Sequence, residues 1–230
     1  MKAPVIVRRR EAVGVWKRLM SVLLVVLLCC PIFAVRAEEI TADGRVNRAL
    51  LVGCDRFLTQ TDTTPSSRNN VLRMVDALSG GTLNMQTLVT REDGLSSASA
   101  LVALIRETFA DADADDVSYF YISTHGLWNT AVNGLMTLLL SDGESEEGIT
   151  AYELRRVFDT IPGKKVLLLD ACHSGAMIGK GVEKSFENLF AGDNYYVVCS
   201  SGGEEESWYW SGEVGGERLA GAGYFSGALA

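Results

Sequence analysis

The chain has 230 residues, 47% of them hydrophobic, which suits one globular domain with its own core and excludes a disordered chain. The charge is uneven: residues 1–37 hold 7 of the 21 basic and 1 of the 29 acidic residues, so the remainder has 14 basic against 28 acidic residues, a net charge of −14. This strongly negative net charge after residue 37 argues against nucleic acid as a partner. It leaves open a cationic substrate, a bound cation such as calcium, or solubility alone.

Residues 1–37 are predicted to be a secretory signal peptide. A basic start is followed by the apolar run Leu19–Val35, and Ala34-Val-Arg-Ala37 has small residues where a signal peptidase would cut. The apolar run has about 17 residues, the short limit for crossing a bilayer, so an uncleaved N-terminal anchor is the weaker alternative. We therefore expect residues 38–230 to be a secreted or cell-surface domain, with a membrane link only if the segment stays uncleaved.

Apolar patterning in this domain predicts strands that alternate with helices. Short apolar runs that end at Gly or Asp indicate buried strands, and apolar residues with a 3.6-residue period indicate helices. The expected elements are a strand at 49–54, a helix at 70–78, a strand at 85–89, a helix at 96–110 with Ser96 or Ser97 as its cap, a strand at 117–123, one arm of an antiparallel excursion at 134–143, a helix at 150–158 with a Thr150–Glu153 capping box, and strands at 165–169 and 195–200. This order predicts an α/β fold with a mostly parallel central sheet and helices on both faces.

Three predicted strands end in residues that can do chemistry. In an open parallel sheet the functional crevice lies at the carboxyl ends of the strands. The three ends read Cys54-Asp55, Ser123-Thr-His-Gly126 and Asp170-Ala-Cys172. Residues far apart in sequence can therefore meet at one edge of the sheet.

A cysteine and a histidine at these ends could form a nucleophile and its base. A thiol attacks as a thiolate, and a nearby imidazole can take its proton. His125 arrives from another strand, whereas His173 is adjacent to Cys172 and is expected to point away from it. The alternative is a buried structural cysteine and an unrelated histidine. Three widely spaced cysteines after residue 37 do not make a disulfide framework, and the absence of CxxC and HxxxH patterns argues against a zinc site.

The stretches Tyr121-Ile-Ser-Thr-His-Gly126 and Leu167-Leu-Leu-Asp-Ala-Cys-His-Ser-Gly175 resemble the motifs of the caspase-like cysteine peptidases. This group contains caspases, metacaspases, paracaspases and clostripain-type enzymes, and the match is closest to bacterial metacaspase-like proteins. The resemblance covers residues 49–226 and implies a caspase-like three-layer sandwich. Thr124 departs from the family, which usually has glycine there. The chain ends one or two elements short of the family fold, so a C-terminally truncated domain is expected.

The resemblance implies roles for individual residues. Cys172 would form a thioester with the scissile carbonyl, and His125 would act as general base and acid. The backbone N–H groups of Gly126 and Cys172 would bind the oxyanion, where one good donor is worth roughly 3 kcal/mol of barrier.

The resemblance also implies a pocket for a basic substrate residue, formed by Asp55, Ser123 and Asp170. A buried carboxylate without a cation is costly, and an arginine guanidinium would supply the matching charge. The alternative is that Asp170 caps local backbone amides. Self-cleavage is predicted after Lys180 or Lys184, in the polar stretch 177–193. No cofactor is required, although calcium activation through the acidic runs 111–116 and 141–147 is a second possibility.

We therefore expect an exported cysteine endopeptidase that cleaves after Arg or Lys. A catalytically inactive caspase-like domain that serves as a binding or scaffold module is the main alternative. A serine esterase is disfavoured because the sequence has no GxSxG motif.

Overall fold

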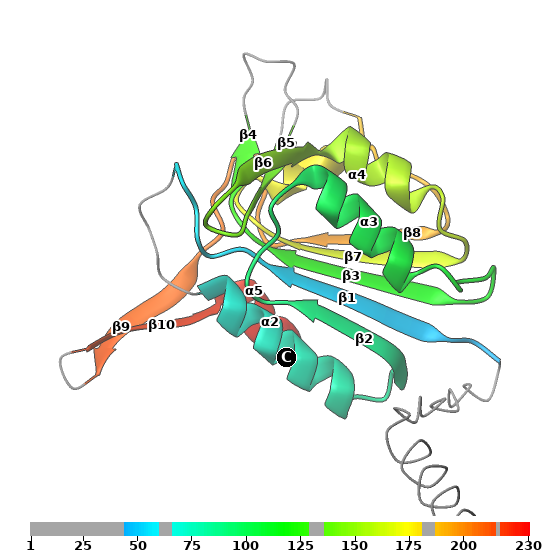
Figure 1. The fold of residues 1–230 in the computed structure, drawn as a ribbon, viewed down its shortest axis with the longest axis horizontal. Helices are drawn as coiled ribbons and strands as arrows, with labels where there is room; N and C mark the ends of the chain where they lie inside the picture. The colour runs from blue at the N-terminus through cyan, green and yellow to red at the C-terminus, as the bar shows by residue number, and fades with distance from the viewer. Residues whose placement is uncertain (1–43, 60–65, 129–135, 181–186, 215–216) are drawn as a thin grey trace, which may run out of the picture. The chain divides into compact units, whose positions relative to one another are not determined.

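A computed structural model of the chain describes residues 44–59, 66–128, 136–180, 187–214 and 217–230. The predicted signal peptide and Lys184 lie outside these ranges. At the centre is a five-stranded sheet in the order β2-β1-β3-β7-β8, and every neighbouring pair is parallel (Figure 1). Its strands are β1 (Asn47–Gly53), β2 (Met85–Arg91), β3 (Val117–Ser123), β7 (Lys164–Asp170) and β8 (Tyr195–Cys199). The predicted parallel sheet is confirmed.

Helices cover both faces of this sheet, as the alternation of its side chains requires. On one face, Leu50 and Phe120 pack with α3 (Ala98–Thr108) and α4 (Ala151–Phe158) in the larger core cluster. On the other, the neighbouring residues Leu51 and Tyr121 pack against α2 (Ser66–Gly80), and α5 (Tyr224–Leu229) lies beside that helix. The expected three-layer α/β architecture is therefore confirmed.

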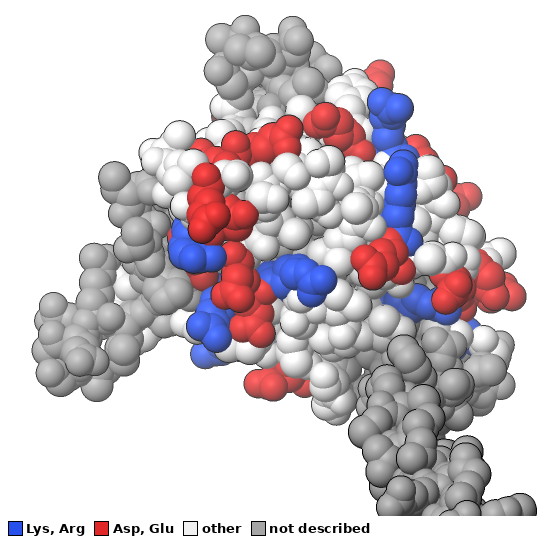
Figure 2. Space-filling view, viewed as in Figure 1, with Lys and Arg blue, Asp and Glu red and all other residues white. Residues whose placement is uncertain are grey.

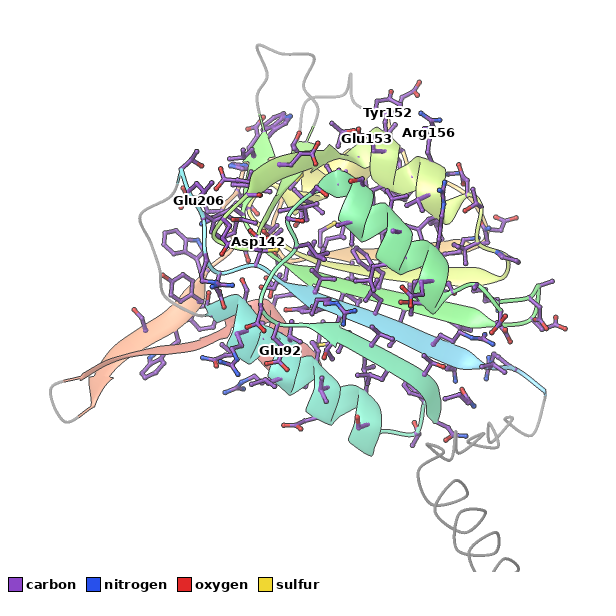
Figure 3. All side chains as sticks on the ribbon, in the orientation of Figure 1. Glu92, Asp142, Tyr152, Glu153, Arg156 and Glu206 are labelled. Carbon is purple, nitrogen blue, oxygen red and sulfur yellow. The ribbon has the colours of Figure 1, made fainter. Side chains whose placement is uncertain are left out.

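The caps of two helices explain where each begins. Ser97 accepts a hydrogen bond from the N–H of Ala100 at the start of α3. Thr150 and Glu153 form the predicted capping box of α4, each side chain bonding to the other's backbone N–H. Figure 3 shows Tyr152 and Arg156 pointing outward from α4, the side that faces away from the sheet.

Two smaller sheets extend the domain at the carboxyl edge of the central sheet. The antiparallel strands β4 (Gly126–Trp128), β5 (Met136–Ser141) and β6 (Glu146–Thr150) form one. The hairpin of β9 (Tyr209–Val214) and β10 (Glu217–Gly223) forms the other and projects from the body (Figure 1). Of these strands, the sequence analysis predicted only the arm that corresponds to β5.

The face in Figure 2 carries acidic and basic side chains interspersed, as expected of a solvated surface. Among the residues that the structure describes, no helix combines the length and the apolar character needed to span a bilayer.

Candidate active site

The catalytic pair predicted from sequence leaves the central sheet from neighbouring strands. Ser123, the last residue of β3, is paired with Asp170, the last residue of β7. The N–H of Thr124 then donates to the Asp170 carbonyl at 3.1 Å, so the two chains remain together one residue further. His125 and Cys172 each lie two residues beyond these paired ends. The sheet therefore delivers both side chains to the same edge.

Gly126 brings the two strand ends into direct backbone contact. A Cβ atom at this position would lie 1.8 Å from the Cys172 carbonyl oxygen and 2.6 Å from the Met136 methyl group, so only glycine fits. The His125 carbonyl accepts a hydrogen bond from the Leu139 N–H at 2.9 Å. Because hydrogen-bonded and non-bonded pairs alternate along an antiparallel ladder, the Gly126 N–H is directed away from β5. This direction suits the predicted oxyanion donor.

A cavity of about 100 Å³ lies at this edge of the sheet. Its lining includes the five residues whose side chains were predicted for the site, namely Asp55, Ser123, His125, Asp170 and Cys172. The structure thus brings the predicted nucleophile, base and pocket residues together around one space. Gly126 contributes through its backbone beside Cys172 and does not line the cavity.

The surroundings of Cys172 favour the neutral thiol over the thiolate. Burial raises its pKa, the negative charges of Glu206 and Asp170 raise it further, and the hydrogen bond from the Ser207 N–H only partly opposes them. The sulfur lies 3.3 Å from that nitrogen and 3.8 Å from the Ser207 carbonyl oxygen. Figure 3 shows Glu206 at the carboxyl edge of the sheet. A nucleophile in this state needs a base to take its proton during attack.

The His125 imidazole packs against Phe57, which follows β1. The two ring centroids are 4.5 Å apart, with an angle of 57° between the ring planes. Phe57 also lines the cavity. An apolar ring on one side of the imidazole restricts its orientation relative to Cys172.

Asp170 is buried, with 5% of its surface exposed, and no basic side chain within the described residues forms an ion pair with it. Its carboxylate accepts hydrogen bonds from Tyr121 Oη (2.9 Å), Asn70 Nδ2 (3.2 Å) and Ser207 Oγ (3.1 Å). Burial nevertheless raises its pKa, an effect that exceeds the opposite effect of the hydrogen bonds. Because its bonded partners are side chains of distant elements, Asp170 does not cap local backbone amides.

Asp55 plays the capping part instead. Its carboxylate accepts hydrogen bonds from the N–H groups of Ser67 (2.7 Å) and Arg68 (2.8 Å), in the first turn of α2. Burial raises the pKa of Asp55, although these bonds act in the opposite direction. Asp55 therefore lines the cavity while its oxygens hold the N-terminus of a helix.

The sequence analysis missed the three residues whose side chains donate hydrogen bonds to Asp170, namely Asn70, Tyr121 and Ser207. Asn70 Nδ2 donates to Ser123 Oγ (2.9 Å) as well as to Asp170, while its Oδ1 accepts from the Gly223 N–H (2.6 Å) and Ser226 Oγ (2.8 Å). The position of Tyr121 two residues before Ser123 on β3 was a usable signal, because residues two apart on a strand share a face. Nothing in the local pattern distinguishes Asn70 or Ser207.

Two other motif residues have structural roles. Thr124 is buried and its hydroxyl donates to the Leu139 carbonyl, so the side chain is directed toward β5. His173 has a left-handed backbone (φ 61°), and its Nδ1 lies 2.9 Å from the Gly203 carbonyl oxygen. The backbone N–H of His173 donates to the Glu205 carbonyl at 2.8 Å. His173 thus orients the loop between β8 and β9 through these two hydrogen bonds.

The remaining sequence predictions concern cleavage and metals. Lys180 is exposed, but its N–H and carbonyl bond to Gly175 and Gly203.

The three cysteines of the described residues are free thiols. In the same part of the chain, no three His, Cys, Asp or Glu side chains gather closely enough to hold a metal ion. One carboxylate of the first acidic run has a basic partner: Asp116 pairs with Arg48 at 2.5 Å.

Comparison with known proteins agrees with this architecture. The structure resembles that of protein GSU0716 from Geobacter sulfurreducens, with a TM-score of 0.55, 13% sequence identity and coverage of 79% of each chain, which shows a shared fold. A search of curated proteins found no match. The family model of the caspase domain, Peptidase_C14, matches residues 46–216. Because that match spans more than half of the sequence and includes both His125 and Cys172, this chain belongs to the caspase domain family of cysteine peptidases.

Proposed function

We propose that this chain is a cysteine endopeptidase that hydrolyses peptide bonds after Arg or Lys. The contact between Gly126 and the Cys172 carbonyl supports the proposal most strongly, because it fixes His125 and Cys172 on adjacent strand ends beside one cavity. The family implies protein substrates in general. The preference for a basic residue is argued from the buried Asp170 carboxylate, which has hydrogen-bond donors around it but no cation within the described residues.

In the proposed mechanism, a substrate backbone lies across the cavity with its basic side chain toward Asp170. His125 takes the proton from Cys172 as the sulfur attacks the scissile carbonyl. The backbone N–H groups of Gly126 and Cys172 bind the oxyanion. His125 then protonates the leaving amine, which yields a thioester on Cys172, and a water molecule activated by the same imidazole hydrolyses it.

Fluorogenic tripeptide amides that end in Arg, Lys or Asp test this proposal. We expect hydrolysis of the Arg and Lys substrates and none of the Asp substrate. Cys172→Ala should abolish the activity, and His125→Ala should lower kcat by about 10²- to 10⁴-fold, the usual contribution of a general base. Hydrolysis that survives Cys172→Ala would contradict the proposal.

Two observations favour the alternative of an inactive binding domain. Ser207 contacts both the Cys172 sulfur and the Asp170 carboxylate, and the thiol pKa is raised. An electrophilic peptide probe that ends in Arg separates the two functions. Labelling of Cys172 that depends on His125 supports the peptidase, whereas equal labelling of wild type and His125→Ala supports the inactive domain.

We also propose that the protein is exported and that it cleaves itself. The candidate cleavage sites are Lys180 and Lys184, and cleavage after Lys180 would first require its hydrogen bonds to Gly175 and Gly203 to open. Intact-mass measurement of wild type should show a cut that is absent in Cys172→Ala, and the variants Lys180→Gln and Lys184→Gln identify which site is used. We propose that catalysis itself uses no cofactor; hydrolysis rates in CaCl₂ and in EGTA test for calcium activation.

A further inference from the structure

A glutamate on the small sheet lies on the same face as the His125 side chain. Glu146, the first residue of β6, is paired with Ser141 of β5. Leu139, two residues before Ser141, donates its N–H to the His125 carbonyl. Paired residues share a face of a sheet, and so do residues two apart on a strand. His125, Leu139, Ser141 and Glu146 therefore project from one face.

Glu146 holds the segment that follows β1. One carboxylate oxygen accepts hydrogen bonds from the N–H groups of Leu58 (2.7 Å) and Thr59 (3.2 Å), and the other accepts from the Thr59 hydroxyl. Three bonds from two consecutive residues fix both the position and the direction of this segment.

The segment held in this way packs against the imidazole. Phe57 precedes Leu58 directly, and its ring centroid lies 4.5 Å from that of His125. A displacement of Leu58 and Thr59 would move the Phe57 ring and release one side of the imidazole. The orientation of His125 thus depends on Glu146 through two contacts in series.

Glu146 also acts on His125 by its charge. Burial raises the pKa of Glu146, but the hydrogen bonds from Thr59 and Leu58 and the positive charge of a protonated His125 lower it, and the net change is downward. Glu146 is therefore ionised at neutral pH, and its negative charge favours the protonated imidazole.

We propose that Glu146 is a positioning residue for His125. It holds the imidazole through the segment 57–59 and stabilises the imidazolium that forms when the proton of the Cys172 thiol passes to the ring. The proposal rests on the proposed peptidase function for its catalytic consequence, but the orientation and charge effects exist without substrate.

Histidine NMR tests the proposal without any need for activity. The chain has only two histidines, so the ring-proton signals of His125 and His173 can be assigned from His125→Ala. We expect Glu146→Gln to move the midpoint of the His125 titration down by about half a pH unit, the size expected for loss of one partly exposed charge. The other titratable side chains of the cavity (Cys54, Asp55, Asp170, Cys172 and Tyr209) are the same in both proteins, so the difference reports Glu146.

Glu147→Gln is the matched control. Glu147 is the next residue of the same strand, loses the same charge, and bonds instead to the Ala98 N–H at the start of α3 (2.8 Å). This variant should leave the His125 midpoint unchanged. Equal midpoints in wild type and Glu146→Gln, or equal shifts in both variants, would overturn the proposal.

Kinetics supply the second measurement. In Glu146→Gln, kcat should fall about 10-fold while KM changes less than about twofold, since the residue touches no substrate. The acidic limb of the kcat/KM profile should move to lower pH. If Glu146→Gln does not fold, Glu146→Asp, which keeps the charge, should give a midpoint within about 0.2 unit of wild type, and a larger fall would contradict the charge effect. If the wild type hydrolyses no substrate but Glu146→Gln shifts the His125 midpoint as expected, only the peptidase function is contradicted.

Discussion

Ser207 contacts two residues of the proposed site, the nucleophile Cys172 and the pocket residue Asp170. Its N–H lies 3.3 Å from the Cys172 sulfur and its hydroxyl 3.1 Å from Asp170 Oδ1. A bound substrate would present its scissile carbonyl to Cys172 and its basic side chain to Asp170. Binding of such a substrate would therefore require Ser207 to move, and the raised pKa values of Cys172 and Asp170 describe the site before that movement.

The raised pKa of Cys172 predicts slow alkylation at neutral pH. Burial, Glu206 and Asp170 all disfavour the thiolate, so the rate of iodoacetamide labelling should keep rising above pH 9, the usual range for a thiol. Peptide mapping by mass spectrometry measures the rate at each pH. Cys199, whose pKa burial raises to about 11, is the internal control and should label in a still more alkaline range. A rate plateau for Cys172 that begins below pH 7 would indicate a resting thiolate–imidazolium pair instead.

The raised pKa of Asp170 predicts that Asp170→Asn stabilises the fold and impairs cleavage. Burial makes the folded state hold this proton more tightly than the unfolded state, so the charged group costs stability above its unfolded pKa. At pH 7 the variant should gain up to about 1 kcal/mol in free energy of unfolding. The gain should vanish as the pH falls toward 4, where wild type becomes protonated, and kcat/KM for Arg and Lys substrates should fall at least about 10-fold. Urea unfolding at several pH values measures the first effect. A destabilised variant would mean that the Asp170 carboxylate mainly stabilises the folded state.

At the scale of elements, α2 connects the fold to the site. Its first turn is held by Asp55, and Asn70 within it bonds to Ser123, Asp170 and Gly223. One wall of the cavity is therefore positioned by a single rigid element, the helix α2.

Asp55→Ala should loosen the start of α2. Loss of the two N–H···carboxylate bonds is expected to lower the free energy of unfolding by about 1 kcal/mol, the usual cost of a lost N-terminal cap. Asp55→Asn keeps an acceptor and should lose less. Hydrogen exchange of the Ser67 and Arg68 amides measures the change locally. Unchanged protection in Asp55→Ala would show that the helix start does not depend on this carboxylate.

The sequence predicts the central elements well because their signals are local. The apolar run of β3 and the Thr150–Glu153 box of α4 need no knowledge of distant residues, and both were predicted with nearly the observed bounds. The site residues at strand ends follow from the parallel order of the sheet. Asn70 and Ser207 could not be predicted, since their partners are about 100 and about 37 residues away along the chain and depend on tertiary packing. The strands β9 and β10 were missed because glycines interrupt their apolar pattern.

At the scale of the whole domain, Gly126 joins the small sheet to the end of β7. The join requires the absence of a side chain, because backbone atoms of Cys172 occupy the place of a Cβ. The geometry of the candidate site is thus a property of how two sheets meet.

Gly126→Ala should separate the two strand ends and abolish hydrolysis. Since the added methyl group meets backbone that cannot rotate away, we expect a loss of about 2–4 kcal/mol in stability, typical of overpacking a rigid site. Gly80→Ala is the control: no atom lies within 4 Å of its added methyl, so it should retain both activity and stability. Thermal unfolding and kcat/KM of the two variants provide the comparison. An active Gly126→Ala would contradict the tight join.

The placement of His125 and Cys172 just beyond the ends of adjacent parallel strands has an evolutionary consequence. The strand ends that carry them are aligned by main-chain hydrogen bonds between β3 and β7, which any sequence able to form these strands will make. Substitutions among the apolar side chains of the two strands can therefore leave this alignment of the backbone unchanged. Gly126 is different, because no side chain fits at its position.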